Sequence, residues 1–442
     1  MATEISHNPD GSMTLSVRFL PGASMLESEL NLQAALNEAG AGATGECLLR
    51  FDTDGSKILI GSQKLTSKGL QPKTYQTPYG PARIARHVYQ SGQGGAVFCP
   101  LDGNARIMRT ATPLFAKQVS FKYANSNAAT VVTDFQQHGR EVARSYVGEV
   151  ADDVASVARD KEWKWTYELP SPPPGEQVKS ISIGVDGTCS LIADDGWRQV
   201  MVGTIAFYNE DGDRLWTNYV ASAPEVGRAT FFAKMEREVK LVKAKYPDAL
   251  YAGVADGAHD LWPWLEKHCP WQVVDFWHAS EYLAAAAPGM CRGKLGRLQW
   301  LEDACHRLKH EADAVASLLR EFKEARAKLA DKSPHRAALD RAISYFTNHE
   351  QRMNYHLYRA MGLPIGSGVT EAACKSVVKE RLCGSGMKWT LDGAENTLTL
   401  RALTKSGGRW EQFWQKTTCL GFAKINAPKR KKQKKLAKPD EI

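Results

Sequence analysis

Apolar and polar positions recur with different periods along the chain, and these periods predict different structures. Residues 1–105 carry short β-type runs such as SMTLSVRFL and CLLRFDTDGSKILIG, together with Asp-Gly pairs that favour turns. Residues 106–168 change to helical spacing, with three segments between Ala111 and Ala158. We therefore expect a small β-rich module over 1–105, of unknown role, followed by a helical domain over 106–168.

The three helical segments resemble a helix-turn-helix. A turn around His138 and Gly139 would start the third helix near Arg140 and Arg144, where both side chains could contact DNA phosphates or base edges. Three helices that pack only on themselves show the same periodicity, so both interpretations stay open.

A proline-rich stretch, LPSPPPGEQ at 169–177, cannot continue a helix and predicts a stiff linker. After it come three β-type runs, a helical segment from Thr230 to Lys245, the strand-like ALYAGVADGA, the short helix HDLWPWLEKH and the strand-like WQVVDFWH. This order, βββαβαβ, predicts an α/β ribonuclease-H-like core with a mixed five-stranded sheet, and we assign residues 178–426 to it.

An all-α insertion is expected within that core, at 279–362. Apolar residues between Lys294 and Leu329 recur at alternating steps of four and three, which predicts a heptad seam on one long helix. The seam consists of Leu301, Cys305, Leu308, Ala312, Val315, Leu319 and Phe322. Ser333 and Pro334 interrupt it, and a second helix from Arg336 to about Met361 would fold back beside the first.

The charge of the chain is concentrated at its end. The net charge is +8, and residues 427–442 hold seven Lys or Arg against two acids, so they supply +5 of it. The KRKKQKK run in this segment predicts a basic, disordered tail and favours a nucleic-acid partner. A merely solvated tail is an equally good interpretation.

The cysteines and the apolar runs bear on the compartment. Nine Cys with no CxxC pair fit a reducing compartment, the start MATEISHNPDGS lacks a secretory signal, and no apolar run approaches the about 18 to 20 residues of a spanning helix. We therefore expect a cytoplasmic protein without a membrane partner. A zinc site is suggested by Cys291, Cys305, His306 and His310, because the two His are i, i+4 on a helix. Cys305 belongs to the heptad seam, however, and this disfavours zinc.

Three acidic residues are the candidate chemistry. Asp186 stands at the end of the predicted buried strand SIGV, and Asp256 repeats this pattern after YAGVA. A charge at such a position is costly unless it meets a metal or a partner. Glu371 can join them from a helix that starts after GLPIGSGV. Such oxygen ligands suit two Mg²⁺ or Mn²⁺ ions, and each Asp-Gly pair taken alone is also an ordinary turn former.

Basic and aromatic residues after Glu371 are candidate DNA contacts. Lys375 and Lys379 would share its helix face at i+4 and i+8 and hold phosphates. Trp389, beside Lys388 and Arg381, could stack on an unpaired base, and core packing of Trp389 is the alternative.

Four motifs, SIGVDGT, VADGAHDLW, VVDFWHASEYL and GSGVTEAACKSVVKERLCGSGMKW, together resemble transposases of the bacterial ISKra-four insertion-sequence family. The resemblance covers residues 178–404 and implies a ribonuclease-H-like fold with an all-α insertion, in which Asp186, Asp256 and Glu371 are catalytic. It implies transposition, with terminal inverted repeats and target DNA as partners, and we expect a homo-oligomer in the active complex.

Such transposases and the related hAT group often carry a Cys-or-Asp, two residues, His motif after the second acid, and Asp275 and His278 match it. The resemblance implies that this pair positions the scissile phosphate or a flipped base. A hydrogen bond at a helix start, or a supplementary metal contact by Asp275, are the alternatives. The paired-Cys zinc ribbons that many relatives carry at the front are absent.

Three other functions remain to be separated from this one. A ribonuclease-H-like nuclease such as a junction resolvase would share the metal site without needing the long insertion. A domesticated transposase would bind DNA without cutting it, and a scaffold built on the helical hairpin would show no metal dependence.

Overall fold

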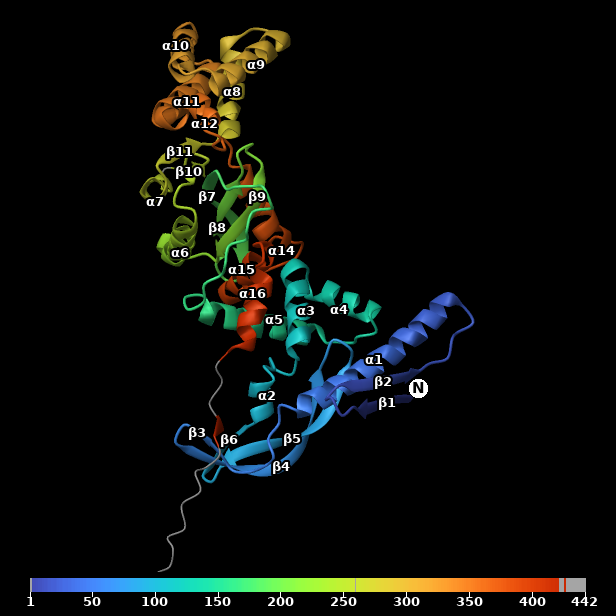
Figure 1. Cartoon of the computed structure of the whole chain (residues 1–442). Helices are drawn as coiled ribbons and strands as arrows, with labels where there is room; N and C mark the ends of the chain where they lie inside the picture. Colours follow the sequence, from blue (N-terminus) through green and yellow to red (C-terminus); the bar gives the residue numbers. More distant parts are fainter. Residues whose placement is uncertain (1, 259, 421–424, 427–442) are drawn as a thin grey trace, which may run out of the picture. The chain divides into compact units, whose positions relative to one another are not determined.

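The computed structural model describes residues 2–258, 260–420 and 425–426 (Figure 1). The predicted basic tail, 427–442, lies outside the described residues. The chain divides into two compact units, which we call unit 1, Met1–Val157 with Phe413–Ile442, and unit 2, Ala158–Gln412. Within the described part of the chain, no helix has the length and apolar character needed to cross a membrane.

Unit 1 contains two antiparallel sheets. The smaller pairs β1 (Ala2–His7) with β2 (Met13–Arg18). The larger has the order β12-β3-β4-β5-β6, where the strands are β3 (Ile58–Ile60), β4 (Gln63–Gln76), β5 (Pro81–Ser91), β6 (Gly94–Phe98) and β12 (Ile425–Asn426). Its core includes Tyr75, Tyr89 and Leu101, which are fully buried. The long β4 and β5 therefore form the centre of this sheet.

The expected β-rich module also contains a helix that the sequence analysis missed, α1 (Met25–Leu49). Ser24 starts it, since its side chain accepts the backbone N–H of Glu27. The β-rich prediction does not allow for a helix here, although the alanines of this segment favour one. A short helix, α2 (Pro100–Asn104), follows the larger sheet.

The three helices expected between Ala111 and Ala158 are present. They are α3 (Pro113–Asn125), α4 (Ala128–Gln137) and α5 (Arg144–Lys161). The third begins at Arg144, because the chain turns at Gly139 with a left-handed φ of 67° and stays non-helical through residue 143.

Unit 2 is built on a mixed five-stranded sheet with the order β11-β10-β7-β8-β9. β11, β10 and β7 run parallel, whereas β7, β8 and β9 are antiparallel neighbours. The strands are β7 (Ser180–Ile192), β8 (Gly196–Tyr208), β9 (Arg214–Ser222), β10 (Leu250–Ala255) and β11 (Trp271–Val274). The short 3₁₀ turn η1 (Val226–Arg228), α6 (Ala229–Lys245) and α7 (Trp262–His268) lie between them in sequence. The predicted order βββαβαβ is confirmed.

Helices cover both faces of this sheet because successive strand residues point to opposite sides. On β8, Met201 and Ile205 belong to the core cluster that contains Met235 of α6. Val202 belongs to a second cluster, with Val377 and Leu398 from the C-terminal helices. Those helices are α13 (Gly368–Ala373), the π-helix η3 (Cys374–Lys379), α14 (Glu380–Leu382), α15 (Leu391–Lys405) and α16 (Arg409–Thr418), which continues into unit 1.

The segment between β11 and α13 is all-α, as expected. It comprises α8 (Phe276–Met290), α9 (Lys294–His310), α10 (Ala314–Ala327), α11 (Pro334–His349), the 3₁₀ turn η2 (Glu350–Arg352) and α12 (Tyr355–Ala360). The prediction of one long helix with a heptad seam is wrong. The seam breaks at exposed Ala312, so that α9 and α10 are separate helices, and both pack against α8 (Figure 1). The second predicted helix is likewise divided into α11, η2 and α12.

Candidate active site

The sheet brings Asp186 and Asp256 to the same level on neighbouring strands. In the parallel pairing of β7 with β10, Gly184 lies opposite Val254. Asp186 comes two residues after Gly184, and Asp256 comes two residues after Val254. The expectation that Asp186 ends its strand is wrong, because β7 continues along β8 with Asp186 opposite Val202. Asp256 does follow the end of β10.

Glu371 lies on α13, which packs directly on β7 and β8. Thr370 Oγ1 is 2.7 Å from Thr204 Oγ1 of β8, and a Cβ added to Gly184 of β7 would come within 1.9 Å of Thr370 Oγ1. Only glycine permits this approach of helix to strand. The helix therefore carries Glu371 over the strand two residues before Asp186.

The three carboxylates are close enough to interact electrostatically. Burial raises the pKa of Asp186, and the negative charges of Asp256 and Glu371 raise it further. The backbone N–H of Gly187, 2.6 Å from Asp186 Oδ1, and the thiol of Cys374, 3.3 Å from Asp186 Oδ2, oppose the shift. The net effect is a carboxyl group whose charge is disfavoured.

Within the part of the chain that the structure describes, no cation pairs with this group. Among the described residues, neither Asp186, Asp256 nor Glu371 forms an ion pair with Lys, Arg or His. Carboxylate oxygens without a basic partner are the ligands that Mg²⁺ and Mn²⁺ prefer. The donor set fits a divalent ion in its chemistry, although within the described residues no three His, Cys, Asp or Glu side chains form a ready metal cluster.

Asp275 lies behind this group and is fully buried. It caps α8, because its Oδ1 accepts the backbone N–H of His278 at 2.9 Å. Its Oδ2 accepts the backbone N–H of Ser367 at 2.6 Å and contacts the Ser367 hydroxyl. The helix-start alternative therefore describes Asp275, whose two carboxylate oxygens both make contacts within unit 2. The positioning role that the resemblance implies for it stays a prediction.

Ser367 connects Asp275 to Glu371 and was missed by the sequence analysis. Its Oγ lies 2.7 Å from Glu371 Oε1 as well as against Asp275, and its side chain is buried. The signal was present in GSGVTE, where a hydroxyl residue stands between two glycines, four residues before the acid. Ser367 thus fixes both the start of α13 and one oxygen of Glu371.

His278 faces an open cleft of about 560 Å³ that extends from Asp256 to α11. Its Nδ1 is 3.3 Å from Glu281 Oε2. Beside it the rings of Tyr282 and Tyr345 stack, with centroids 3.9 Å apart. The cleft is also lined by Arg341, Ser344 and Asn348, which are exposed. The insertion therefore contributes a polar and aromatic wall next to the carboxylates.

Tyr345 ties that wall to the sheet. Its hydroxyl donates to the backbone carbonyl of Asp256 at 3.1 Å. Burial raises the pKa of Tyr345, so the phenol stays neutral and keeps the proton that it donates. This second residue missed by the sequence analysis holds the backbone of one candidate metal ligand.

The predicted DNA contacts after Glu371 divide into two groups. Lys375, Lys379 and Lys388 are exposed. Lys375 and Lys379 lie in the π-helix η3, which the sequence analysis did not anticipate. Glu371, Lys375 and Lys379 are all exposed, and the contact of the two lysines with DNA stays a prediction.

Arg381 and Trp389 pack on each other instead. Arg381 is buried, with its guanidinium 4.9 Å from the centre of the Trp389 ring. Trp389 Nε1 donates to the Leu382 carbonyl at 3.1 Å, and the ring packs against the cluster around Val377. The prediction of Arg381 as a DNA contact is wrong, and the core-packing alternative describes Trp389.

The two arginines proposed for the helical segment differ in exposure. Arg140 is buried and donates to the carbonyl of Thr77 and to the side chain of Gln76. The prediction that it contacts DNA is wrong, because its guanidinium is used within unit 1. Arg144, at the first position of α5, is exposed.

No family model matches the chain, and no curated protein matches it. The geometry of the carboxylates and of the elements that hold them is therefore the basis for assigning a function.

Proposed function

We propose that this chain is a DNA transposase of the Asp-Asp-Glu type with a ribonuclease-H-like catalytic core. The observation that carries the proposal is the electrostatic proximity of Asp186, Asp256 and Glu371, which come from two adjacent strands and a packed helix. The order of strands in the mixed sheet and the all-α insertion before Glu371 support the fold assignment. The four motifs that resemble ISKra-four transposases support the same function.

Asp186, Asp256 and Glu371 would hold two Mg²⁺ or Mn²⁺ ions. The chemistry that divalent ions supply between carboxylates is activation of an attacking hydroxyl and stabilisation of a leaving oxygen in phosphodiester attack. The protein keeps Asp186 in the ladder of β7 with β8 and restrains Glu371 through Ser367. No covalent intermediate with the protein is required.

The cleft beside Asp256 supports a nucleic-acid substrate. Arg341, Ser344 and Asn348 offer one cation and polar groups to a phosphodiester chain, and the aromatic pair Tyr282 and Tyr345 adds apolar surface. Exposed Lys375, Lys379 and Lys388 add positive charge downstream of Glu371. Within this proposal, His278 contacts the strand being cut, since it lines the same cleft.

A second candidate is a DNA-binding protein that does not cut. The lack of a ready metal cluster among the described residues favours it, because the three side chains would have to reorient around an ion. The two candidates make opposite predictions about metal-dependent cleavage.

The test uses the full chain and a supercoiled plasmid carrying the element's terminal repeats, with Mg²⁺ or Mn²⁺. We expect nicking and strand transfer by the wild type, and their loss in Asp186→Asn, Asp256→Asn and Glu371→Gln while DNA binding persists. Asp260→Asn is a matched control, because Asp260 lies four residues after Asp256 and pairs with Arg228 instead.

Each outcome separates the candidates. Cleavage by any of the three carboxylate variants would refute the assignment. DNA binding by a wild type that never cleaves would favour the second candidate, and cleavage without strand transfer would indicate a nuclease or resolvase.

A further inference from the structure

Charge is strongly segregated within unit 1. Residues 55–101 contain six Lys or Arg and no Asp or Glu, whereas the first 49 residues contain six acids and one Arg. The cationic stretch coincides with β3, β4, β5 and β6 of the larger sheet. Exposed cations on such a segment can attract polyanions.

Five of the six cations are exposed and unpaired. Among the residues that the structure describes, none of them has an acidic partner. They are Lys57, Lys64, Lys68, Lys73 and Arg83. The sixth, Arg86, is buried and bonds Tyr75 and the Gln71 carbonyl. The surface cations are therefore available to a ligand.

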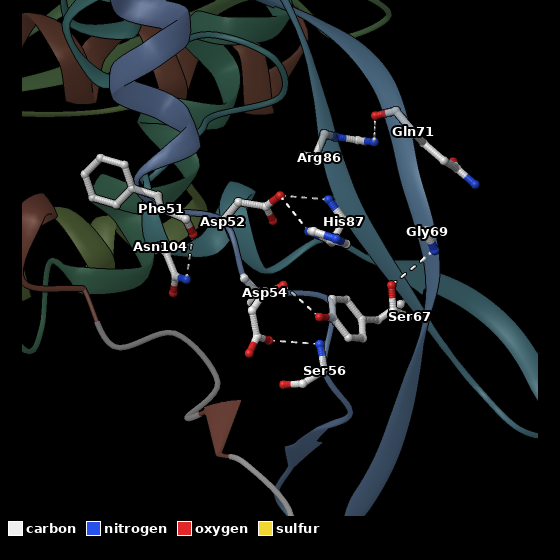
Figure 2. A network of polar contacts seen from close by, with 12 residues as sticks. Phe51, Asp52, Asp54, Ser56, Ser67, Gly69, Gln71, Arg86, His87 and Asn104 are labelled. Atoms are coloured by element: carbon white, nitrogen blue, oxygen red, sulfur yellow. Dashed lines mark hydrogen bonds and ion pairs between the residues drawn. The ribbon is translucent and has the colours of Figure 1, made fainter. Parts of the chain in front are cut away.

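The acids of the loop before β3 are engaged in local contacts (Figure 2), and Glu38 and Glu46 of α1 line a pocket together with Arg83. Asp52 Oδ2 accepts the backbone N–H of His87 at 2.9 Å and lies 3.0 Å from Nδ1 of the His87 ring. Asp54 accepts the backbone N–H of Ser56 at 2.9 Å, and Asp102 accepts the hydroxyl of Tyr75. Asp52 and Asp102 thus contact β5 and β4 through His87 and Tyr75, and among the described residues neither forms an ion pair with the five exposed cations.

Beyond their pairing with β3 and β6, at 70–76 and 81–87, the strands β4 and β5 form a two-stranded ribbon. Helix α1 packs on the face that carries Ile84, and the opposite face, which carries Arg83, is exposed. Lys73 pairs with buried Ile84, and the next pair along the ribbon is Thr74 with Arg83, both exposed. Because neighbouring residues point to opposite faces, Lys73 and Arg83 project to opposite sides. A bulge between Ser67 and Leu70 interrupts the register and carries exposed Lys68.

We propose that the ribbon of β4 and β5 is a binding surface for duplex DNA. The major groove of DNA admits a two-stranded ribbon. Arg83 on the open face, together with exposed Lys68 and Lys73, can contact the phosphates beside the groove. This inference rests on the proposed function for its choice of DNA, and it assigns end or target binding to the β-sheet of unit 1. The helical segment at 106–168, expected from the sequence to bind DNA, is not required for it.

The test compares two full-length variants that each lose three positive charges. The ribbon variant is Lys68→Gln/Lys73→Gln/Arg83→Gln. The control is Arg214→Gln/Lys240→Gln/Lys267→Gln, in which all three replaced residues are exposed in unit 2. Binding to a duplex carrying the terminal repeat is measured by fluorescence anisotropy in EDTA over a series of salt concentrations, and thermal unfolding checks the fold.

For the ribbon variant we expect at least tenfold weaker binding and a slope of log K against log salt that is smaller by up to about 2.7, from three lost phosphate contacts. The control should keep the wild-type slope. Equal losses in the two variants, or an unchanged slope in a folded ribbon variant, would overturn the inference. Tighter binding to duplex RNA than to duplex DNA would overturn it as well.

Cleavage is measured separately, so the two proposals can fail independently. If the ribbon variant loses DNA binding and the wild type never cleaves DNA, the DNA-binding ribbon stands and the transposase function is refuted. If the ribbon variant binds DNA as the wild type does and the wild type cleaves DNA through Asp186, the transposase function stands and the DNA-binding ribbon is refuted.

Discussion

The buried carboxylate of Asp275 holds Ser367 through both its backbone amide and its hydroxyl. The same hydroxyl oxygen lies 2.7 Å from Glu371 Oε1, so one hydroxyl proton faces two carboxyl groups. The first turn of α13 is thereby fastened to the first turn of α8, although the two helices are separated by the whole insertion. This relationship gives Asp275 and Ser367 a positioning role in the proposed reaction.

Replacing Ser367 by Ala should slow DNA cleavage by about 10- to 100-fold, since a hydrogen bond to a charged group contributes about 1.5–3 kcal/mol. The loss should fall on kcat, with KM for DNA nearly unchanged, because Ser367 orients Glu371 and does not contact DNA. Ser367→Thr keeps the hydroxyl and should recover part of the rate. A variant that loses DNA affinity and not kcat would contradict the positioning role.

Replacing Asp275 by Asn should destabilise unit 2 by about 1.5–3 kcal/mol. The two oxygens of Asp275 accept from the backbone N–H groups of His278 and Ser367. Asn has only one oxygen, so one of these two donors would face the amide N–H₂ group, which is itself a donor. Urea unfolding followed by tryptophan fluorescence measures this loss. Full stability in Asp275→Asn would show that the buried contacts with Ser367 do not stabilise the fold.

Asp186 should reduce the stability of the metal-free protein at neutral pH. Its folded pKa is raised by burial and by Asp256 and Glu371, so the stability linked to its neutral form is fully present below pH 3.8 and is lost as pH rises through the folded pKa. In EDTA at pH 7, Asp186→Asn should be at least as stable as the wild type, with the difference vanishing in acid. Mg²⁺ should raise the Tm of the wild type and of Asp260→Asn but not that of Asp186→Asn.

Gly184→Ala should push α13 away from β7, because the new Cβ would lie 1.9 Å from Thr370 Oγ1. We expect a destabilisation of about 1–3 kcal/mol and slower cleavage. Adding Thr370→Ala should restore part of the stability and part of the cleavage rate, and the double-mutant cycle measures the coupling between residues 184 and 370. Gly148→Ala, where no atom lies within 4 Å of the added Cβ, should cause neither loss. Additive effects of the two substitutions would contradict the steric account.

Cys374 should resist alkylation in the folded protein. Burial raises the pKa of its thiol, and the neighbouring Asp186 raises it further, so almost no thiolate forms near pH 8. The exposed Cys189, Cys383 and Cys419 should react first with iodoacetamide, as peptide mass spectrometry would show. Early labelling of Cys374 would mean that α13 and the π-helix detach from the sheet under native conditions.

The strands and the acids of unit 2 could be predicted because their signals are local. Apolar runs followed by Asp-Gly pairs identify β7 and β10, and the parallel pairing of these strands brings both acids to one level. The length of β7 beyond Asp186 could not be predicted, since it depends on pairing with β8, which no local pattern encodes. The ordinary helix period likewise gave no sign of the π-helix at Cys374–Lys379.

The burial of individual polar residues was the least predictable part of the site. Arg140 and Arg381 carry the same charge as exposed Arg144, and only tertiary contacts with Thr77 and Trp389 distinguish them. Ser367 and Tyr345 touch residues that are distant in sequence, so their roles could not be read from spacing.

The continuation of β7 past Asp186 makes the two halves of the candidate site mechanically unequal. Asp186 lies within a 13-residue strand that is paired along its whole length with β8. Asp256 follows a six-residue strand and precedes Gly257, whose φ of 110° is accessible mainly to glycine. A change in the separation of these two carboxylates during a reaction cycle would therefore come from movement of Asp256 and its loop, with Asp186 as the fixed reference point.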